Sequence, residues 1–443
     1  MKKRVGIFIG DKFHARSLVE SGTLNLLLEK YQVTVFTTSI LKGNFLKYER
    51  QLDLVEININ KKVLRLFRLH LKLGTARFYR KSKSFKFRIK RYVLGDYYPE
   101  KDIIAQLYWI IKTTLKALDV LIRFQVGKSV LYLMIQNNYL ESVESILKPR
   151  TINKDDFDIL LSWCSTSEPS ALAPIVFGAK VSIPSMVVVD NWDNLCSKSI
   201  FPVEPNSLVC FGNQSARFAR TIHDFQQTRI FPIGSARFEV YRDYICGRET
   251  IEGIDYLYAG SAIAIEDEEV LQFLQDYSLS RNLNKKFRYR RHPFPQGPKI
   301  HLEDLKKKYS TIEIEEINTL ESLNQTKESL LSCKTLIAMP TTFFLEGIVC
   351  GIPTILLSLE SRKIRTDSRA MINNLEHLSG IEELQGLEVA RDFTQLSSLL
   401  DSTIEVSGNN STELVSEFVN WPNDSFGKRL ELAINETIEL YQK

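Results

Sequence analysis

Short apolar runs alternate with amphipathic stretches along most of this chain. Residues 5–9 have the length and character of a buried strand, a helical pattern of leucines follows, and residues 32–37 predict a second strand. Strand, helix and strand in this order form a βαβ unit, and such units build parallel sheets. The beginning of the chain is therefore predicted to be an α/β domain.

The same alternation is clearest in residues 335–357, TLIAMPTTFFLEGIVCGIPTILL. This stretch predicts a buried strand, a tight turn at Pro340-Thr341-Thr342, a short helix, a glycine stop at Gly351 and a second buried strand. Ligands of a parallel sheet bind beyond the carboxyl ends of its strands. The turn is therefore predicted to lie at a ligand-binding edge.

Other strands are predicted at intervals through the chain, and the alternation restarts after Gly247 in a second block. They span about residues 158–163, 181–189, 207–212, 229–233, 255–259, 287–290, 311–314 and 388–390. A chain of 443 residues is too long for one ordinary domain. We therefore expect two Rossmann-like α/β domains, residues 1–233 and 234–420, facing each other across a cleft. A C-terminal helix in residues 421–443 is expected to cross back to the first domain.

Residues 61–150 interrupt the first domain with a helical, basic insertion. Thirteen of the chain's 58 basic residues lie between 61 and 91, and no acid occurs between Glu56 and Asp96. The other 45 bases are outnumbered by 53 acids, so the net charge of +5 describes a basic arm on an acidic body. Apolar residues interleave with the charges, which favours docking on anionic lipid head groups. A solvated helical hairpin and a nucleic-acid grip are the alternatives.

Composition is that of a folded protein. Six cysteines occur without CxxC spacing, which favours reduced thiols in the cytoplasm over a disulfide or zinc framework. The opening MKKRVGIFIG lacks the longer apolar core and the cleavage site of a signal peptide, and no window reaches the apolar length of a membrane-spanning helix. A cytoplasmic protein, peripheral on the inner face of the plasma membrane through residues 61–91, is the expectation.

Two polar motifs predict an anion site in the second domain. The free amides and positive dipole end of the helix after Thr341 and Thr342 suit a phosphate, and the hydroxyls lie beside them. Arg291 and His292, in the run RRHP, follow another predicted strand. The alternative is that Thr342 only caps the helix and that Glu346 is only a carboxylate near the helix start.

Candidate general bases follow strands of the first domain. Asp11 and His14 lie in the loop after the first strand, and Glu168 lies in the loop after residues 158–163. The run DNWDNLCSK, residues 190–198, adds Asp193 together with Trp192, whose indole suits stacking on a sugar. A turn in which Asp and Asn hydrogen-bond their own backbone is the alternative for this run.

These motifs carry a family resemblance that extends over residues 158–357. DNWDNLCSK, FGNQSARFA and PIGSARF resemble the middle of bacterial surface-polysaccharide glycosyltransferases of the GT-B fold. RRHP and TTFFLEGIVCGIP resemble their second domain and that of the related CDP-glycerol glycerophosphotransferases. DNWDNL and RRHP are the more specific parts, because the strand–turn–helix–GIP pattern is shared by many GT-B enzymes.

The resemblance implies roles for individual residues. It places the donor's phosphates on His292, Thr341 and Thr342, and it brings Glu346 to the ribose. Thr-Thr replaces the commoner Ser-Thr and keeps both hydroxyls. The other residues assigned to donor binding are Arg291, a charge partner for the leaving diphosphate, and the turn Gly260-Ser261. The sequence has no obvious Asp-x-Asp metal site, as is usual for this fold, and no cofactor is expected besides the nucleotide-activated donor.

The function that the sequence favours is metal-independent transfer of a sugar from a nucleotide-sugar donor to a surface-polysaccharide or lipid-linked acceptor. Fixed donors would stabilise charge on the leaving phosphate, while Asp193 or Asp11, or else His14 or Glu168, activates the acceptor hydroxyl. A CDP-glycerol-type polyol-phosphate transferase, a nucleotide-sugar epimerase and a non-catalytic membrane-associated scaffold are the alternatives. Nucleic acid is not expected as a partner.

Overall fold

A computed structural model describes most of the chain. The described residues are 2–99, 102–147, 152–164, 168, 172–198, 200–201, 203–242, 253–261, 264–281, 285–292, 301–315, 322–402, 412–421 and 424–441. They divide into two compact units. The first comprises Met1–Val93, Ile111–Glu239 and Ser416–Lys443, and the second comprises Leu94–Ile110 and Val240–Val415. The division at Val240 falls six residues after the predicted boundary at 234.

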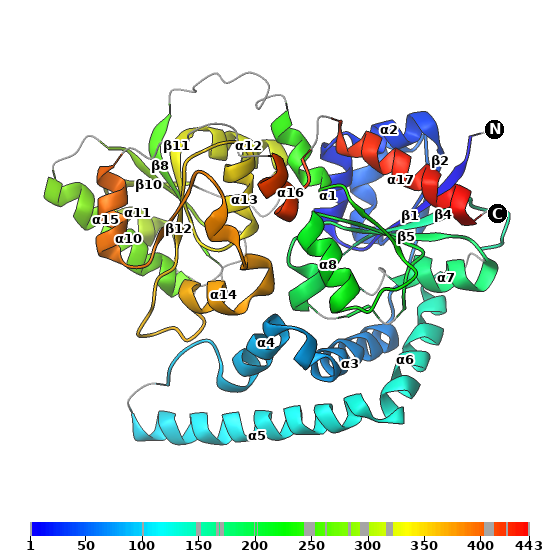
Figure 1. Ribbon diagram of the computed structural model, residues 1–443, viewed down its shortest axis with the longest axis horizontal. Coiled ribbons are helices and arrows are strands. Elements are labelled where there is room, and N and C mark those ends of the chain that lie inside the picture. Colours follow the sequence, from blue (N-terminus) through cyan, green and yellow to red (C-terminus); the bar gives the residue numbers. More distant parts are fainter. Residues whose placement is uncertain are drawn as a thin grey trace. The chain divides into compact units, whose positions relative to one another are not determined.

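The first unit is built on a seven-stranded sheet in which all neighbouring strands are parallel (Figure 1). Its strand order is β3-β2-β1-β4-β5-β6-β7, so the direction of winding reverses between β1 and β4. In parallel sheets, such a reversal at the carboxyl edge is the usual place for a ligand site. The bounds are β1 Arg4–Ile9, β2 Gln32–Thr37, β3 Asp53–Glu56, β4 Ile159–Cys164, β5 Ser185–Val189, β6 Ser207–Cys210 and β7 Arg229–Pro232.

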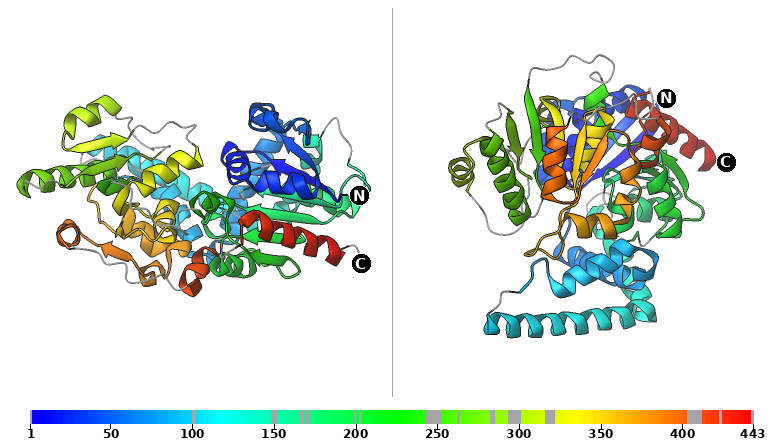
Figure 2. Two further views of the ribbon diagram at one scale, coloured as in Figure 1. Left: turned by 90° about the horizontal axis from the view of Figure 1, so that it is seen from above. Right: turned by 60° about the vertical axis from the view of Figure 1, so that its left-hand side comes forward.

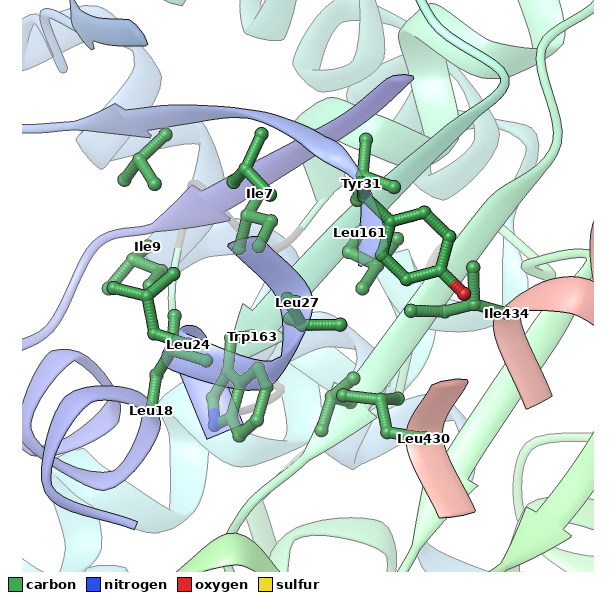
Figure 3. Packing of buried hydrophobic residues seen from close by; sticks show 14 of the residues in the cluster. Ile7, Ile9, Leu18, Leu24, Leu27, Tyr31, Leu161, Trp163, Leu430 and Ile434 are labelled. Atoms are coloured by element: carbon green, nitrogen blue, oxygen red, sulfur yellow. The ribbon is translucent and has the colours of Figure 1, made fainter. Parts of the chain in front are cut away.

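Both faces of this sheet are buried, which explains why its strands are continuous apolar runs. Along β1, Ile7 and Ile9 join one core cluster, whereas Phe8 joins the other, as the two-residue period of a strand requires. Figure 3 shows Ile7 and Ile9 packed with Leu24 and Leu27. The helices of this unit around the sheet are α1 Lys12–Glu20, α2 Thr23–Lys30, α7 Ala173–Val181, α8 Asn213–Thr221 and α17 Phe426–Tyr441.

The C-terminal helix α17 belongs to the core of the first unit. Leu430 and Ile434 are fully buried beside α2 and Trp163 (Figure 3). The start of α17 is also held by the 3-10 turn that follows β7, because Glu239 in this turn accepts a hydrogen bond from the amide of Phe426 at 2.8 Å. Figures 1 and 2 show α17 in red against the blue α2, so the last helix closes the same core that the first strand opens.

The second unit repeats the plan with six parallel strands in the order β10-β9-β8-β11-β12-β13. Its winding reverses between β8 and β11. The strands are β8 Ile254–Ala259, β9 Phe287–Arg290, β10 Ile312–Glu315, β11 Cys333–Ala338, β12 Thr354–Leu357 and β13 Leu387–Ala390. The main helices are α10 Ala264–Arg281, α11 Leu302–Lys308, α12 Leu323–Leu331, α13 Thr342–Val349, α14 Ser368–Asn374 and α15 Phe393–Asp401, and α16 Thr412–Phe418 continues into the first unit.

The predicted insertion between β3 and β4 is helical. Its helices are α3 Lys61–Arg77, α4 Lys83–Leu94, α5 Ile103–Lys128 and α6 Val130–Val143. The inner face of α3 packs on α6, where Phe67 meets Tyr139 with ring centroids 5.7 Å apart. The basic residues of α3 and α4 therefore lie on a folded helical layer. None of the described helices is long and apolar enough to span a bilayer.

The cysteines of the described residues are reduced and buried: Cys164, Cys196, Cys210, Cys333 and Cys350. Burial raises the pKa of the Cys333 thiol to about 12, which keeps it protonated and unreactive. Cys246 lies outside the described residues. These thiols act as small apolar core groups.

Replacing Leu430 with alanine should destabilise the first unit by about 2–5 kcal/mol, because a fully buried leucine leaves a cavity. The matched control is Leu432→Ala on the same helix, whose side chain is 59% exposed. Urea denaturation followed by tryptophan fluorescence measures both. Equal stabilities for the two variants would contradict the packing of α17 into this core.

Candidate functional site

Three adjacent strands of the first sheet bring titratable side chains to its carboxyl edge. His14 lies in α1 after β1, Glu168 follows β4, and Asp190 follows β5 directly. Because β1 pairs with β4 and β4 pairs with β5, all three loops leave from neighbouring positions at the reversal of winding. The sequence predicted His14 and Glu168 as separate candidates, and the structure brings them into contact.

His14 and Glu168 form a buried ion pair. The Nδ1 of His14 lies 2.9 Å from Oε1 of Glu168, and the two side chains are only 4% and 14% exposed. Burial by itself lowers the pKa of His14, but the attraction and hydrogen bond of Glu168, with Asp190 and Asp11 farther away, raise it to about 9. The imidazole is therefore charged at neutral pH. Among the described residues, the other ring nitrogen, Nε2, is buried without a hydrogen-bond partner.

Asp190 is the acid of the DNWDN run that faces this pair. It is 5% exposed, accepts a hydrogen bond from the indole Nε1 of Trp163 at 3.3 Å and accepts another from the hydroxyl of Ser235. Sequence reasoning chose Asp193 from this run and passed over Asp190. Asp190 could have been recognised from the sequence by its position directly after the buried strand β5, at the carboxyl end of that strand.

Asp193 and Trp192 adopt the structural roles that were the alternative. The carboxylate of Asp193 accepts from Ser197 at 2.7 Å and pairs with Lys198 at 3.0 Å, within the π-helical turn Asn194–Lys198. Trp192 is 2% exposed and donates its indole N–H to Gln214 at 3.2 Å. The expectation that Trp192 offers a flat surface for a sugar is therefore wrong in this structure, because the ring is interior.

Asp11 is the N-cap of α1. Its carboxylate accepts a hydrogen bond from the amide of Phe13 at 2.7 Å, which satisfies one of the free donors at the helix start. It also contributes to the raised pKa of His14. Asp11 is thus placed to support the charge on His14, and its role as a base stays a prediction.

The second sheet gathers three loops at its own carboxyl edge. The amide of Met339 after β11 donates to Ala259 O at 3.3 Å, and the amide of Gly260 after β8 donates to Arg290 O at 3.0 Å. The guanidinium of Arg290 lies 5.2 Å from the ring centre of Phe343 in the first turn of α13. The loops after β9, β8 and β11 are therefore consecutive neighbours.

The start of α13 has the features of an anion site. Thr341 occupies the N-cap position with extended backbone, and its side chain makes no capping hydrogen bond. Within the described part of the chain, no acceptor is found for the amides of Thr342 and Phe343. The first turn of α13 contains no acid. Two hydroxyls, free amides and the helix dipole thus converge where the sequence predicted a phosphate cradle.

The neighbouring helix α10 is unsuited to an anion. Its first turn carries Glu266 and Asp267, and both are buried. Asp267 accepts from the hydroxyls of Tyr258 at 2.8 Å and Tyr289 at 2.7 Å, while burial raises its pKa to about 6. Burial also raises the pKa of Glu266 to about 8, so that carboxyl is largely protonated at neutral pH. The carboxyl groups at this helix start disfavour a bound phosphate.

Gly260 and Ser261 take part in that internal network. The amide of Ser261 donates to Asp267 at 2.8 Å. A Cβ on Gly260 would lie 2.4 Å from Oδ2 of Asp267 and 2.8 Å from the ring of Tyr289, so only glycine fits. The local sequence signal, a strand followed by Gly-Ser, thus has a structural cause, and donor binding by these two residues stays a prediction.

The remaining predicted donor residues are at the same edge. Arg291 and His292 follow β9 and are partly exposed, and Arg291 lowers the pKa of Asp267 by attraction. Pro293 of the RRHP motif lies outside the described residues. Glu346 is 1% exposed and accepts a hydrogen bond from the hydroxyl of Tyr241, so in this structure it is an interior group of α13. Its contact with a ribose stays a prediction.

Sequence reasoning passed over Arg290 as a positioning residue. Its guanidinium is buried, pairs with Glu315 at 2.6 Å and stacks over Phe343. The contact with Phe343 links the end of β9 to the start of α13, and the pairing with Glu315 links it to the end of β10. Among the described residues, no cluster of three or more His, Cys, Asp or Glu side chains is arranged to hold a metal ion.

Comparisons with known proteins find similarity at the level of structure. A scan against protein-family models finds no match, and a search of curated proteins finds none either. A protein from Listeria monocytogenes assigned as a UDP-N-acetylglucosamine 2-epimerase is similar with a TM-score of 0.54 and 11% identity, over 99% of this chain and 98% of that chain. The UDP-GlcNAc 2-epimerase of Methanocaldococcus jannaschii gives 0.50 and 11%, over 98% and 99%.

A weaker match is the Arabidopsis thaliana protein UGT89C1 complexed with UDP, with a TM-score of 0.47 and 13% identity over 99% of this chain and 100% of that chain. At identities this low the similarity shows a shared fold alone. Together with the two parallel sheets, it confirms the predicted fold class, two Rossmann-like domains of the GT-B kind.

The His14–Glu168 pair should make stability depend on pH. The folded pKa of His14, about 9, lies above the ordinary value of 6.5, so its stabilising contribution is complete below pH 6.5 and is lost as pH rises through 9. Glu168→Gln should therefore be less stable than wild type at pH 6, and the difference should shrink towards pH 9.5. Denaturation followed by tryptophan fluorescence checks this.

The matched control for Glu168→Gln is Glu56→Gln, which breaks an exposed pair with Lys42. That change should cost less than about 1 kcal/mol, because solvent screens an exposed ion pair. A Glu168→Gln effect that does not change between pH 6 and 9.5 would contradict the charged state of His14.

Proposed function

We propose that this protein is a glycosyltransferase that moves a sugar from a nucleotide-sugar donor to a saccharide or lipid-linked acceptor of a surface polysaccharide. The observation that carries the proposal is the buried His14–Glu168 pair at the winding reversal of the first sheet. Burying a charged imidazole with its carboxylate carries a desolvation cost, and groups with strongly shifted pKa values cluster at functional sites. This arrangement supports proton transfer at that edge.

The acceptor step belongs to the first unit. An acceptor hydroxyl becomes a nucleophile when a base removes its proton, and Nε2 of His14 is the ring nitrogen that Glu168 leaves available. Glu168 orients the ring and stabilises the imidazolium that forms. Because His14 has a pKa of about 9, only a small fraction is neutral at pH 7 in the substrate-free protein. Transfer should therefore accelerate as pH rises towards 9.

The donor step belongs to the second unit. Breaking the bond between the sugar and the diphosphate places negative charge on the leaving phosphate, and fixed hydrogen-bond donors lower that barrier. The amides of Thr342 and Phe343, the hydroxyls of Thr341 and Thr342, and the side chains of Arg291 and His292 are the donors of the proposal. The contact of Arg290 with Phe343 holds the loop after β9 beside the start of α13.

A nucleotide-sugar epimerase is the second candidate. It is favoured by the similarity, with TM-scores of 0.54 and 0.50, to structures of proteins described as UDP-GlcNAc 2-epimerases. The two reactions share the donor site of α13 and differ in the need for an acceptor. A UDP-sugar that is isomerised with no acceptor present would replace the transferase proposal. A donor screen that includes CDP-glycerol and CDP-ribitol distinguishes a polyol-phosphate transferase, which would use one of these donors, from a glycosyltransferase, which would use a nucleotide sugar.

Donor binding should depend on the hydroxyls at the start of α13. After a thermal-shift screen of nucleotide sugars and CDP-polyols has found the donor, Thr341→Val/Thr342→Val should weaken its binding by about 10- to 100-fold. Each lost hydroxyl is a hydrogen bond to a charged phosphate. Thr394→Val, an exposed threonine of α15, is the control and should bind normally. Calorimetric titration measures both variants, and unchanged affinity in the double variant would contradict the site.

The acceptor step should depend on His14. His14→Asn should lower kcat by at least about a hundredfold and remove the rise of kcat/KM with pH, while donor affinity stays within about twofold. The reason is that the variant removes a group of the first unit and leaves α13 intact. Initial rates between pH 6 and 9.5, with the donor found in the screen, provide the measurement. A variant that transfers at the wild-type rate would exclude His14 as the base.

A further inference from the structure

Helix α5 exposes its apolar side chains. Ten large apolar residues along it are more than half exposed, with Ile104 at 76%, Leu115 at 62% and Ile122 at 63%. The ten are Ile103, Ile104, Leu107, Tyr108, Ile110, Ile111, Leu115, Leu118, Leu121 and Ile122. They form the outer face of α5. Single exposed apolar residues are common on proteins, but an apolar stripe of this extent marks an interaction surface.

The opposite, packed face of α5 carries much of the helix's polarity. Trp109 donates its indole N–H to Leu94 O at 3.1 Å, and Arg123 lies 4.6 Å from the ring centre of Tyr92. The hydroxyl of Tyr92 donates to Asp119 at 2.9 Å. These contacts fix the rotation of the helix, so the apolar face cannot turn inward without breaking them.

The apolar surface continues onto α6. Four apolar residues at the start of α6 are exposed: Val130, Leu131, Leu133 and Met134. Tyr132, which lies between them in sequence, is buried beside Arg77. The end of α5 is held against α3, because the backbone carbonyl of Gly127 in α5 accepts a hydrogen bond from Arg77 of α3 at 2.6 Å. The outer face of α5 and the first turn of α6 are therefore one apolar strip.

Positive charge lies beside this strip, on the helices that pack against the inner face of α5. Residues 61–91, which form most of α3, α4 and the short turn between them, contain thirteen lysines and arginines and no acid, and this segment contacts α5 through Arg77, Tyr79 and Tyr92. Between residues 103 and 134 there are four further bases and a single acid, Asp119, which pairs with Arg123. In Figure 1 and in the right-hand view of Figure 2, α3 and α4 lie along one side of α5.

We propose that the outer face of α5, with the first turn of α6, docks on the surface of a bilayer that contains anionic lipids. A helix of 26 residues is about 39 Å long and lies in the plane of the interface, with its leucines and isoleucines among the acyl chains. The bases of α3 and α4 attract the head groups. The helix does not cross the bilayer, which agrees with the described residues containing no helix that is long and apolar enough to do so.

The chemistry of the strip favours a lipid surface over other occupants. A second copy of the chain would bring two basic segments of the same sign together, and like charges repel. Nucleic acid would contact the lysines and arginines but not the strip. Nucleobases stack on aromatic rings, and the strip is almost entirely aliphatic. Only an anionic bilayer satisfies the aliphatic strip and the positive charge together.

The test uses the full-length protein and sedimentation with vesicles of phosphatidylcholine alone or of phosphatidylcholine and phosphatidylglycerol at 3:1. We expect binding to the mixed vesicles that is at least tenfold tighter than to phosphatidylcholine and that weakens as salt is raised. Leu115→Glu/Leu118→Glu/Ile122→Glu should reduce binding to the mixed vesicles at least tenfold. The matched control, Leu279→Glu/Leu432→Glu/Leu440→Glu, changes three similarly exposed apolar residues elsewhere and adds the same charge. It should bind like wild type.

A second measurement on the unmodified protein does not depend on the folding of any variant. Hydrogen exchange of the amides in residues 103–134 should slow when mixed vesicles are added, and exchange in α17 should not. The proposal is overturned if wild-type protein fails to bind mixed vesicles, if the α5 triple variant binds them as well as the control, or if vesicles leave exchange in residues 103–134 unchanged. It is also overturned if the strip instead mediates a dimer or RNA binding that excludes vesicles.

Discussion

Parallel strand pairing is the constraint on which the rest of this structure depends. Every strand pair in both sheets is parallel, so each connection must return the chain across the sheet and every strand ends at the same edge. At β1/β4 and at β8/β11 the winding reverses, and loops from adjacent strands separate there. The polar groups that follow β1, β4 and β5 meet for this reason, as do those that follow β9, β8 and β11.

The carboxyl edges of the two sheets carry different charged groups. In the first unit a charged imidazole is buried and held by Glu168. In the second unit two acids at the start of α10 are buried: Asp267 accepts hydrogen bonds from two tyrosine hydroxyls, and burial raises the pKa of Glu266 to about 8. The first turn of α13 contains no acid. The proposed function would use the first edge for proton transfer and the second for binding the donor's phosphates.

Much of this architecture is predictable from local patterns. Apolar runs of strand length, the turn at Pro340-Thr341-Thr342 and the basic helices of the insertion follow from period and composition, which act over a few residues. The site is less predictable, because it depends on which side chains the fold turns inward. Asp190 and Asp193 belong to one polar run, yet only Asp190 faces the core, and the buried position of Trp192 follows from contacts with Gln214 and α16.

The outward face of α5 illustrates the same limit. Its leucine spacing indicates a helix correctly, but a helical period does not say whether the apolar face meets the protein or something outside it. That distinction arises from Tyr92, Leu94 and Asp119, which hold the opposite face through contacts distant in sequence. Basic charge interleaved with apolar residues drew attention to residues 61–91, whereas the largest exposed aliphatic surface lies in the helix that follows.

The place of α17 has a consequence for biosynthesis. Leu430 and Ile434 complete the core around β1, although more than 400 residues of chain separate them from its first strand. A ribosome releases the N-terminal strands early and α17 much later, with the second unit synthesised in between. The nascent first sheet must therefore wait with an exposed apolar face until α17 has been synthesised, and during that interval this face is a binding site for chaperones.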